Sequence, residues 1–357
     1  MSPQDGVRNL LANCAQARPG ERLLIAYEPE DHGYFDADVR NFVATGATEH
    51  GLAITLVNVG FEFSRTDLPD SLAHQIADFD IVVFLSRLGD QLRFSDLPIG
   101  PRYVVCFALN GHLLGSAFGS ADYRAFCQIK DAVDRYIFAA TDVVLTCPAG
   151  TNVTGCVPEG AAKPSDTTSL RFPLSVFSPV PAAQFSGRVA LGQFLTGTGS
   201  RYYSGYTVEF ENPVFAMLEN GRLAGFDGSQ DDVAKANAHY DRVAELFQID
   251  RNFVHSWHAG IHPGCGFPWD IRQNYERWGG SAFGNPRVLH FHTCGAYAPG
   301  EISWNVFDPT IEISGERIWD AGHFHLERLP SGQEILNDFQ DVADVFAAPD
   351  RNVGLGD

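Results

Sequence analysis

The sequence predicts a two-part chain: an α/β half with a doubly wound, mostly parallel sheet, followed by an α+β half with a largely antiparallel sheet. Three observations support this prediction. A chain of 357 residues is too long for one small core. Over roughly the first 150 residues, near-continuous apolar runs alternate with amphipathic segments. Beyond them, short strands follow one another with few helices between them.

Five apolar runs in the first half have the character of buried strands. Each is almost entirely apolar, as strands of a parallel sheet are when helices cover both faces. Helical patterns lie between them, notably over residues 34–50 and 121–139. The expected strands are Arg22–Tyr27, Ala53–Val59, Asp80–Leu85, Tyr103–Leu109 and Asp142–Thr146.

The turn after the first strand argues against a dinucleotide site. A glycine-rich GxGxxG segment is expected there in such a site, but Glu28-Pro29-Glu30-Asp31 follows the strand. Because these carboxylates repel a pyrophosphate, the N-terminal half is not expected to bind a dinucleotide.

The stretch from Val157 to Gln184 is rich in Pro, Ser and Ala, which is typical of a crossing between domains. We therefore expect an α/β domain over residues 1–156, a crossing segment over 157–184, and an α+β domain carrying the reactive site over 185–357.

The second half begins with a predicted hairpin and a helix. Asn220-Gly221 is a strong hairpin turn, and Ser229–Phe247 is an amphipathic helix. A second turn is expected at Ser314-Gly315, and a helix over residues 335–346 closes the chain. The expected strands are 206–211, 214–219, 222–226, 253–261, 288–294, 302–307 and 310–319.

The composition excludes several classes of partner and site. The formal net charge of −19 repels nucleic-acid phosphates and anionic lipid heads, so neither partner is expected. The seven cysteines contain no CxxC pair. No signal peptide is visible, nor any run of about 18 apolar residues that could cross a membrane. We expect a cytoplasmic protein that acts on a small molecule.

Histidines gather in the second half. Seven of the twelve fall between residues 255 and 325, where a random spread would place about two or three. Neutral imidazole is the commonest metal ligand among side chains, so this clustering favours a metal site over a set of hydrogen-bonded core histidines. The seven are His255, His258, His262, His290, His292, His323 and His325.

Strand alternation selects the candidates. In Val288–His292 it places His290 and His292 on one face. His255 and His258 would face opposite sides of an extended strand unless a bulge intervenes. Glu301 enters the next strand and can complete a metal shell or act as a general base. The predicted metal ligands are His255, His290, His292, Glu301 and His323, and the predicted catalytic residues are Glu301 and His258.

Two residues are candidates for substrate binding. Arg201 follows a turn rich in Gly, Ser and Thr, whose amides can hold an anionic group, although a plain turn explains the segment as well. Trp304 represents the aromatic residues of the second half, which would suit a flat substrate, although core packing explains them equally well. No HExxH helix, GxSxG elbow or phosphate-binding GxxxxGK[ST] loop is present.

Four segments carry a family resemblance. In their order along the chain, they resemble the thermophilic metallo-aminopeptidase family and its offshoot, the 2,5-dihydroxypyridine 5,6-dioxygenases. The resemblance implies an N-terminal α/β domain, a C-terminal domain with the metal site, and a homodimer. The segments are Cys147–Thr154, His258–Pro263, His290–Tyr297 and Ile311–Gly322.

The chain departs from this family where metal ligands are expected. No carboxylate precedes Ala259-Gly260-Ile261, and Glu301-Ile302-Ser303 stands where both groups have His-x-Asp. A two-metal centre needs bridging carboxylates, whereas two His and one carboxylate suit a single non-haem iron. We therefore expect an Fe²⁺-dependent, ring-cleaving dioxygenase-like enzyme for a small aromatic or heteroaromatic acid. The alternatives are a zinc or manganese metallohydrolase that cleaves an amide bond, and a metal-free, ligand-binding pseudoenzyme.

Overall fold

The computed structural model describes residues 1–355 except 64, 159, 161–166, 198 and 296–297. Its N-terminal part contains a five-stranded sheet in the order β2-β1-β3-β4-β7, in which every pairing is parallel. This confirms the predicted parallel sheet. The strands are β1 (Arg22–Tyr27), β2 (Ala53–Asn58), β3 (Ile81–Leu85), β4 (Arg102–Cys106) and β7 (Leu170–Phe172).

Helices cover both faces of this sheet. Leu23 and Ile25 pack in the same core as Val39 of α2, whereas Leu24 and Ala26 pack with Leu72 of α3. The sheet is therefore doubly wound, as the continuous apolar strands predict. The helices here are α1 (Pro3–Arg8), α2 (Ala37–Glu49), α3 (Asp70–Ile76), α4 (Arg87–Gln91), α5 (Gly111–Gly115) and α6 (Ala117–Ser120), with a π-helical turn over Asn9–Cys14 and a 3-10 turn over Glu30–His32.

The remainder contains two antiparallel sheets, which confirms the predicted α+β half. The six-stranded sheet has the order β11-β10-β16-β15-β14-β8. Its strands are β8 (Val180–Pro181), β10 (Phe194–Thr196), β11 (Val208–Glu209), β14 (Val254–Ala259), β15 (Val288–Thr293) and β16 (Ile302–Phe307).

The eight-stranded sheet has the order β13-β12-β9-β6-β5-β17-β18-β19. Its hairpins β12–β13 and β17–β18 turn at the two predicted positions, Asn220-Gly221 and Ser314-Gly315. Its strands are β5 (Val143–Thr146), β6 (Asn152–Gly155), β9 (Phe185–Ala190), β12 (Val214–Glu219), β13 (Arg222–Gly228), β17 (Thr310–Ile313), β18 (Glu316–Asp320) and β19 (His323–Phe324).

Placing the strand Asp142–Thr146 in the parallel sheet was wrong. As β5 it pairs with β6 and β17 in the antiparallel sheet. The fifth parallel strand is instead β7, which comes from the predicted crossing segment and pairs with β4. Sheet pairing thus crosses the predicted boundary at residue 156 in both directions, and the boundary itself stays a prediction.

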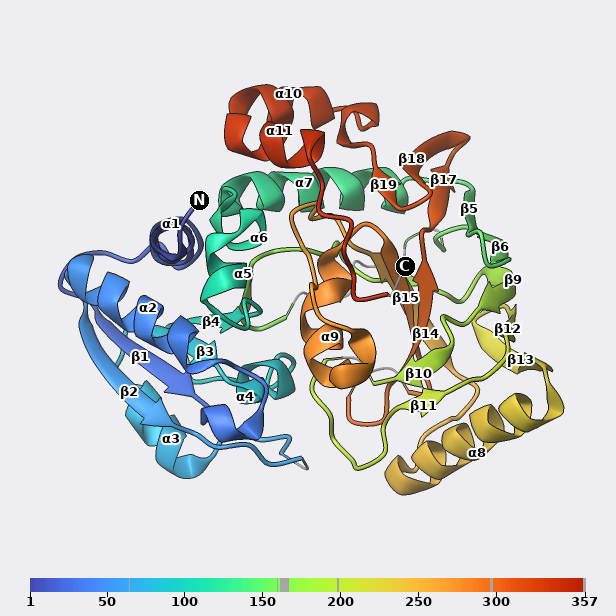
Figure 1. Ribbon diagram of the computed structural model, residues 1–357, viewed down its shortest axis with the longest axis horizontal. Coiled ribbons are helices and arrows are strands. Elements are labelled where there is room, and N and C mark those ends of the chain that lie inside the picture. Colours follow the sequence, from blue (N-terminus) through green and yellow to red (C-terminus); the bar gives the residue numbers. More distant parts are fainter. Residues whose placement is uncertain (64, 159, 161–166, 198, 296–297, 356–357) are drawn as a thin grey trace.

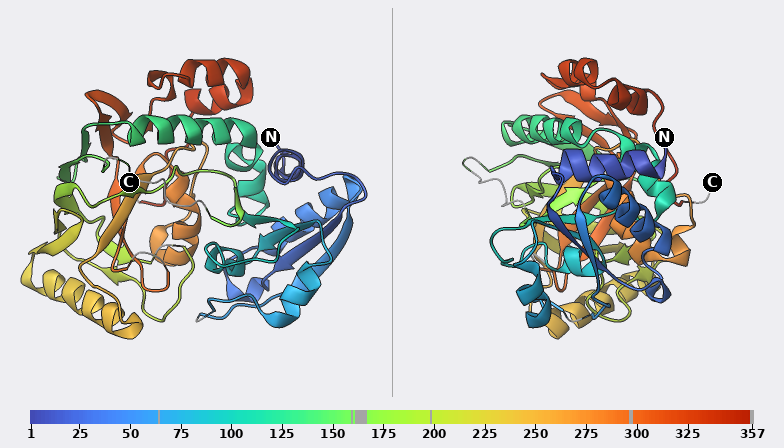
Figure 2. Two further views of the ribbon diagram at one scale, coloured as in Figure 1. Left: turned by 180° about the vertical axis from the view of Figure 1, so that it is seen from behind. Right: turned by 90° about the vertical axis from the view of Figure 1, so that its left-hand side faces the viewer.

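Longer helices pack outside the antiparallel sheets. In Figures 1 and 2, α7 runs along one side of the molecule, α10 and α11 lie over it, and α8 covers β13 at the far end. The predicted helix 335–346 is two helices, because Phe339 adopts a non-helical φ of −127° and ψ of 85°. The helices are α7 (Tyr123–Phe138), α8 (Gln230–Phe247), α9 (Tyr275–Ser281), α10 (Gly332–Asp338) and α11 (Gln340–Ala347), with 3-10 turns over Ile271–Gln273, Ala282–Gly284 and Leu326–Arg328.

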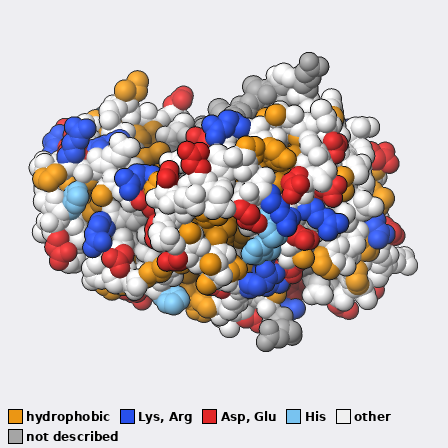
Figure 3. All heavy atoms as spheres, turned by 90° about the horizontal axis from the view of Figure 1, so that it is seen from above, with side chains coloured by type: hydrophobic (Ala, Val, Ile, Leu, Met, Phe, Trp, Pro, Cys, Tyr) orange, Lys and Arg blue, Asp and Glu red, His pale blue; other side chains and the backbone are white. Residues whose placement is uncertain are grey.

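In the described ranges, no helix has both the length and the apolar character needed to cross a lipid bilayer. Acidic and basic side chains lie interspersed over the face drawn in Figure 3.

Candidate metal centre

Two neighbouring strands of the six-stranded sheet, β14 and β15, carry the three histidines of the centre, and Glu301 directly precedes the next strand, β16. β15 pairs with β14 so that His258 lies opposite His290, and Ser256 lies opposite His292. Cross-strand partners share a face, and residues two apart on one strand share it too, so these four side chains project from the same side of the sheet. The predicted common face of His290 and His292 is confirmed by this register.

A bulge in β14 decides which histidines reach that side. The pairing with β15 shifts between Val254 and Ser256. Such a bulge is the condition under which His255 and His258, three residues apart, can face the same side of the strand. His258 joins His290 and His292. His255 lies on the bulge, borders the same cavity, and its Nδ1 is 2.9 Å from Ser256 Oγ.

The three buried imidazoles converge through the same ring nitrogen. His258 Nε2 lies 2.7 Å from His290 Nε2 and 3.1 Å from His292 Nε2. Within the part of the chain that the structure describes, these three form the group of His, Cys, Asp or Glu side chains placed to hold a metal ion.

The opposite ring nitrogens fix the tautomers of two of these rings. His258 Nδ1 lies 2.9 Å from the carbonyl oxygen of Phe177, and His292 Nδ1 lies 2.7 Å from Glu301 Oε1. Because these oxygens accept, both Nδ1 atoms carry the proton, and in the neutral rings both Nε2 lone pairs face the centre. Metal-ligating histidines are held in this way, with the far N–H donated to a carbonyl or carboxylate. The donor set therefore fits a bound cation.

Burial keeps two of the three rings, those of His258 and His290, neutral. Burial lowers the pKa of His258 and of His290 well below the usual histidine value, and neighbouring His292 adds to the effect. Burial alone would raise the pKa of Glu301, but His292 and the Arg93 guanidinium hold that pKa below its usual value. The centre thus combines the unprotonated Nε2 atoms expected for His258 and His290 with an ionised carboxylate next to His292, a combination that suits metal binding.

A cavity of about 120 Å³ opens onto the three rings. An engineered cavity of ~150 Å³ in another protein holds benzene, so this volume suits a single-ring ligand. Its apolar wall contains Phe94, Phe107 and Phe283, and the Phe283 ring stacks on His290 at a centroid distance of 4.0 Å. A flat molecule can therefore lie beside the imidazoles.

Two arginines from outside the antiparallel sheets line the same cavity. Arg93 follows α4 and makes ion pairs with Asp90 at 3.0 Å and with Glu301 at 3.2 Å. Arg171 lies on β7 of the parallel sheet, and its charge helps to lower the pKa of His258 and His290. The cavity thus carries cationic side chains although the whole chain is strongly acidic.

The remaining predicted site residues lie elsewhere. His323 is on β19, where its ring packs 4.5 Å from that of His325, outside the residues that line the cavity. Trp304 is paired with Phe291 on the opposite face from the histidines, and its indole N–H donates to the Tyr240 hydroxyl at 2.6 Å. Neither side chain is brought to the cluster.

Arg201 also points away from the cavity. Its Nε lies 3.1 Å from Glu276 Oε2, and its guanidinium lies over the Phe63 ring. The neighbouring turn holds an anion supplied by the protein itself, since the Ser200 N–H donates to Asp90 at 2.8 Å. Gly199 is required there, because its φ is +69° and an added Cβ would lie 2.3 Å from Asp90 Oδ2.

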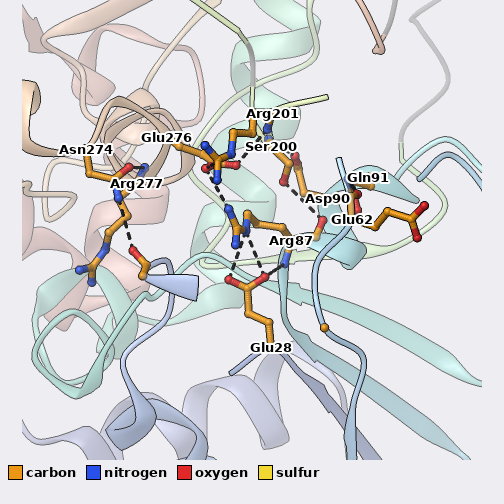
Figure 4. A network of polar contacts seen from close by, with 12 residues as sticks. Glu28, Glu62, Arg87, Asp90, Gln91, Ser200, Arg201, Asn274, Glu276 and Arg277 are labelled. Carbon is orange, nitrogen blue, oxygen red and sulfur yellow. Dashed lines mark hydrogen bonds and ion pairs between the residues drawn. The ribbon is translucent and has the colours of Figure 1, made fainter. Parts of the chain in front are cut away.

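A buried ion-pair network joins the two halves beside this turn (Figure 4). Arg87 Nε lies 3.1 Å from Glu28 Oε2, and Arg87 Nη1 lies 2.9 Å from Glu276 Oε2 of α9. Glu28 and Arg87 follow β1 and β3, at the sheet edge where doubly wound folds usually bind ligands. Glu276 of α9 reaches that edge here and pairs with Arg87.

Several residues of the centre carry no sequence signal. Arg93, Arg171 and the Phe177 carbonyl come from separate elements and belong to no motif, so the fold alone reveals them. The spacing of Asp90 and Arg93 indicates at most a local ion pair. Ala296 and Tyr297, part of the predicted family resemblance, lie outside the described residues.

Comparisons with known proteins support the fold. No protein-family model matches the chain, and no curated protein matches it by sequence. Among solved structures, 2,5-dihydroxypyridine dioxygenase from Pseudomonas putida KT2440 is similar with a TM-score of 0.58 and 10% identity, over 90% of this chain and 96% of that one. AmpT from Thermus thermophilus is similar with a TM-score of 0.52 and 12% identity, over 90% and 98%. The predicted resemblance is confirmed as a likeness of fold.

Proposed function

We propose that the chain is a mononuclear metal-dependent enzyme, dioxygenase-like, that acts on a small aromatic or heteroaromatic acid. The observation that carries the proposal is the convergence of three buried Nε2 atoms, in two of whose rings the opposite Nδ1–H donates to a carbonyl or a carboxylate oxygen. Nitrogen lone pairs that face one another at 3.1 Å repel unless a cation lies between them.

The donors favour one metal ion over two. Two close cations need bridging carboxylate charge, whereas the converging groups are all imidazoles. Glu301 stands behind His292, and its two oxygens face His292 and Arg93. In this proposal His258, His290 and His292 hold the ion, and Glu301 orients His292.

Residues of the cavity account for a ring-shaped, anionic substrate. Phe283 and Phe107 offer flat apolar surface, and the positive charge of Arg171 attracts a carboxylate or phenolate. His255 borders the same cavity, and burial lowers the pKa of its imidazole. An Fe²⁺ ion held by the three histidines would supply the redox chemistry that dioxygen needs to react with an aromatic ring.

Oxygen uptake tests this proposal. Protein reconstituted anaerobically with Fe²⁺ is mixed with a panel of hydroxylated benzoic and pyridine carboxylic acids in an oxygen electrode. At least one acid is expected to cause stoichiometric oxygen consumption with loss of its aromatic absorbance, and the H290A variant should consume none. Iron-loaded protein that leaves the whole panel and the oxygen unchanged contradicts the dioxygenase assignment.

A second candidate is a metallohydrolase, favoured by the similarity to AmpT, an aminopeptidase. Three histidines also hold catalytic zinc in other folds, with water in the open position. Amide hydrolysis by the zinc- or manganese-loaded protein would support this candidate. Failure to bind any of the three metals would leave the metal-free ligand-binding protein.

A further inference from the structure

A buried polar cluster on α7 lies outside the groups used above. Lys130 and Asp134 are one helical turn apart, with Lys130 Nζ 3.0 Å from Asp134 Oδ2, and the Asp134 side chain is fully buried. Both side chains meet Ser178, which precedes β8. Lys130 Nζ donates to Ser178 Oγ at 3.0 Å, and that hydroxyl donates to Asp134 Oδ2 at 2.8 Å.

The backbone of Ser178 links this cluster to the candidate metal centre. Asp134 Oδ1 accepts the Ser178 N–H at 2.9 Å. The carbonyl of the same peptide unit is that of Phe177, which accepts the Nδ1–H of His258 at 2.9 Å. In a planar trans peptide the N–H and the C=O point in opposite directions, so one rigid group is held by a carboxylate at one end and by an imidazole at the other.

We propose that Asp134 is a positioning residue for His258 and acts on it through the 177–178 peptide. The Asp134 carboxylate polarises the peptide. This makes the Phe177 carbonyl a stronger acceptor for the hydrogen bond from the Nδ1–H of His258. His292 is supported by the carboxylate of Glu301 directly, so two of the three imidazoles have a carboxylate behind them, one of them across a peptide bond.

Lys130 has a separate part in this arrangement. A buried carboxylate without a cation would take up a proton and lose the charge that polarises the peptide. Lys130 supplies that cation from the same helix. The segment that carries the peptide is held separately, because the Phe177 ring packs edge-on against His258 and Trp257. The inference concerns the orientation and tautomer of His258, and it rests on the proposed function for its effect on metal binding.

The test uses the double variant K130M/D134L, which removes both charges of the ion pair together. Asp232 of α8 provides a matched control. It is also buried, and it accepts the N–H groups of Glu211 and Asn212, the Ser229 hydroxyl and the Lys235 ammonium. The variant D232L/K235M therefore makes the same chemical change away from the cavity.

Two readouts separate this inference from the proposed function. Long-range ¹⁵N–¹H NMR of the metal-free protein is expected to show the Nδ1–H tautomer of His258 in the wild type and control, and a mixture of tautomers in K130M/D134L. Calorimetric titration with Fe²⁺ under argon should show affinity weakened about tenfold or more in that variant only, since partners that support a metal ligand have effects of this size.

An unchanged His258 tautomer together with unchanged Fe²⁺ affinity in K130M/D134L overturns the inference. If the wild type binds no Fe²⁺, the proposed function fails, and the NMR result alone decides whether Asp134 positions His258. Should K130M/D134L not fold, judged by circular dichroism, D134N preserves the side-chain volume and is expected to change both readouts in the same direction.

Discussion

At the scale of single residues, the carboxylate behind His292 is the most informative group. Glu301 accepts a hydrogen bond from the Nδ1–H of His292. It also makes an ion pair with Arg93, which comes from the N-terminal half. Its role in the proposed site is to fix one imidazole with its lone pair toward the centre. That role depends on charge, which an amide of the same shape lacks.

We therefore predict that E301Q weakens Fe²⁺ affinity about 10- to 100-fold, the usual effect of removing a partner behind a metal-ligating histidine. Competition with a chromophoric chelator measures the change. E327Q is the matched control, because Glu327 makes a similar contact with His325 Nδ1 at 2.9 Å away from the cavity. Equal affinities for E301Q and E327Q would rule out this role.

Sequence reasoning reached part of this centre. Strand alternation correctly placed His290 and His292 on one face, because a period of two needs no tertiary information. Ser303 and Asn305 pair with His292 and His290 and therefore share their face of the sheet. Trp304 lies between them, so the same alternation places it on the other face. The Phe177 carbonyl was not predictable, since any residue can supply a backbone acceptor.

At the scale of elements, His262 shows how the segment after β14 is fixed to the helices. Its buried ring stacks on Phe126 of α7 at 3.8 Å with 5° between the planes, and it meets Phe118 of α6 edge-on. Its Nδ1 accepts the Gly264 N–H at 3.2 Å. A run such as His262-Pro263-Gly264 is typical of a surface loop, but here aromatic residues of distant helices cover it.

This packing predicts a pH dependence of stability. Burial lowers the pKa of His262 from 6.5 to about 3, so the unfolded chain takes up a proton at a higher pH than the folded one. The stability is therefore complete above pH 6.5, and below it this residue removes about 1.4 kcal/mol per pH unit until the pH nears the folded-state pKa.

Urea unfolding of the wild type and H262Q at pH 7, 6 and 5 measures this contribution. H262Q is expected to be less stable at pH 7 but to lose less stability on acidification, whereas the same change at the exposed His32 should leave the wild-type slope. A slope for H262Q as steep as that of the wild type would show that His262 does not carry the effect.

Two elements, β5 and the bulge in β14, could not be assigned from the sequence pattern alone. The run at β5 is as apolar as the parallel strands, and only its pairing with β6 and β17 assigns it to another sheet. The bulge in β14 is seen only in the pairing with β15. The sequence could therefore state that His255 and His258 face the same side only if a bulge intervenes, but it could not decide whether one does.

At the scale of the whole molecule, buried charges connect the parallel sheet to the antiparallel part. Arg87 lies between Glu28 and Glu276, which come from opposite halves, and its guanidinium covers the Phe61 ring at 3.4 Å. Burial raises the pKa of Glu28, although the charge of Arg87 opposes this. The network lies next to the Asp90, Arg93 and Glu301 contacts, so it holds the two sides of the cavity together.

Replacing Arg87 should therefore strongly lower the free energy of unfolding. R87L leaves Glu28 buried without its cation and Glu276 with Arg201 alone, and we predict a loss of about 3–5 kcal/mol in the free energy of unfolding. R222L removes an exposed pair with Asp250 and should cost no more than about 1 kcal/mol. Guanidinium unfolding compares the two, and similar losses for both variants would contradict a special role for Arg87.

The overall architecture was the part most open to prediction, because the change from continuous apolar strands to short alternating ones extends over hundreds of residues. The contribution of both halves to one cavity could not be predicted, because only the packing of the fold brings Arg93, Arg171 and Glu301 together. The cluster of histidines in the sequence therefore indicated a site and some of its members, but not the residues that the N-terminal half contributes.

Metal content measured by mass spectrometry tests the central claim most directly. Chelator-treated protein is reloaded with Fe²⁺ under argon and desalted. We predict one ion per chain for the wild type and for H323A, whose histidine lies on β19 outside the cavity, and less than a tenth of an ion for H258A and H290A. A wild type without iron, or an H290A variant that retains a full equivalent, would contradict the account.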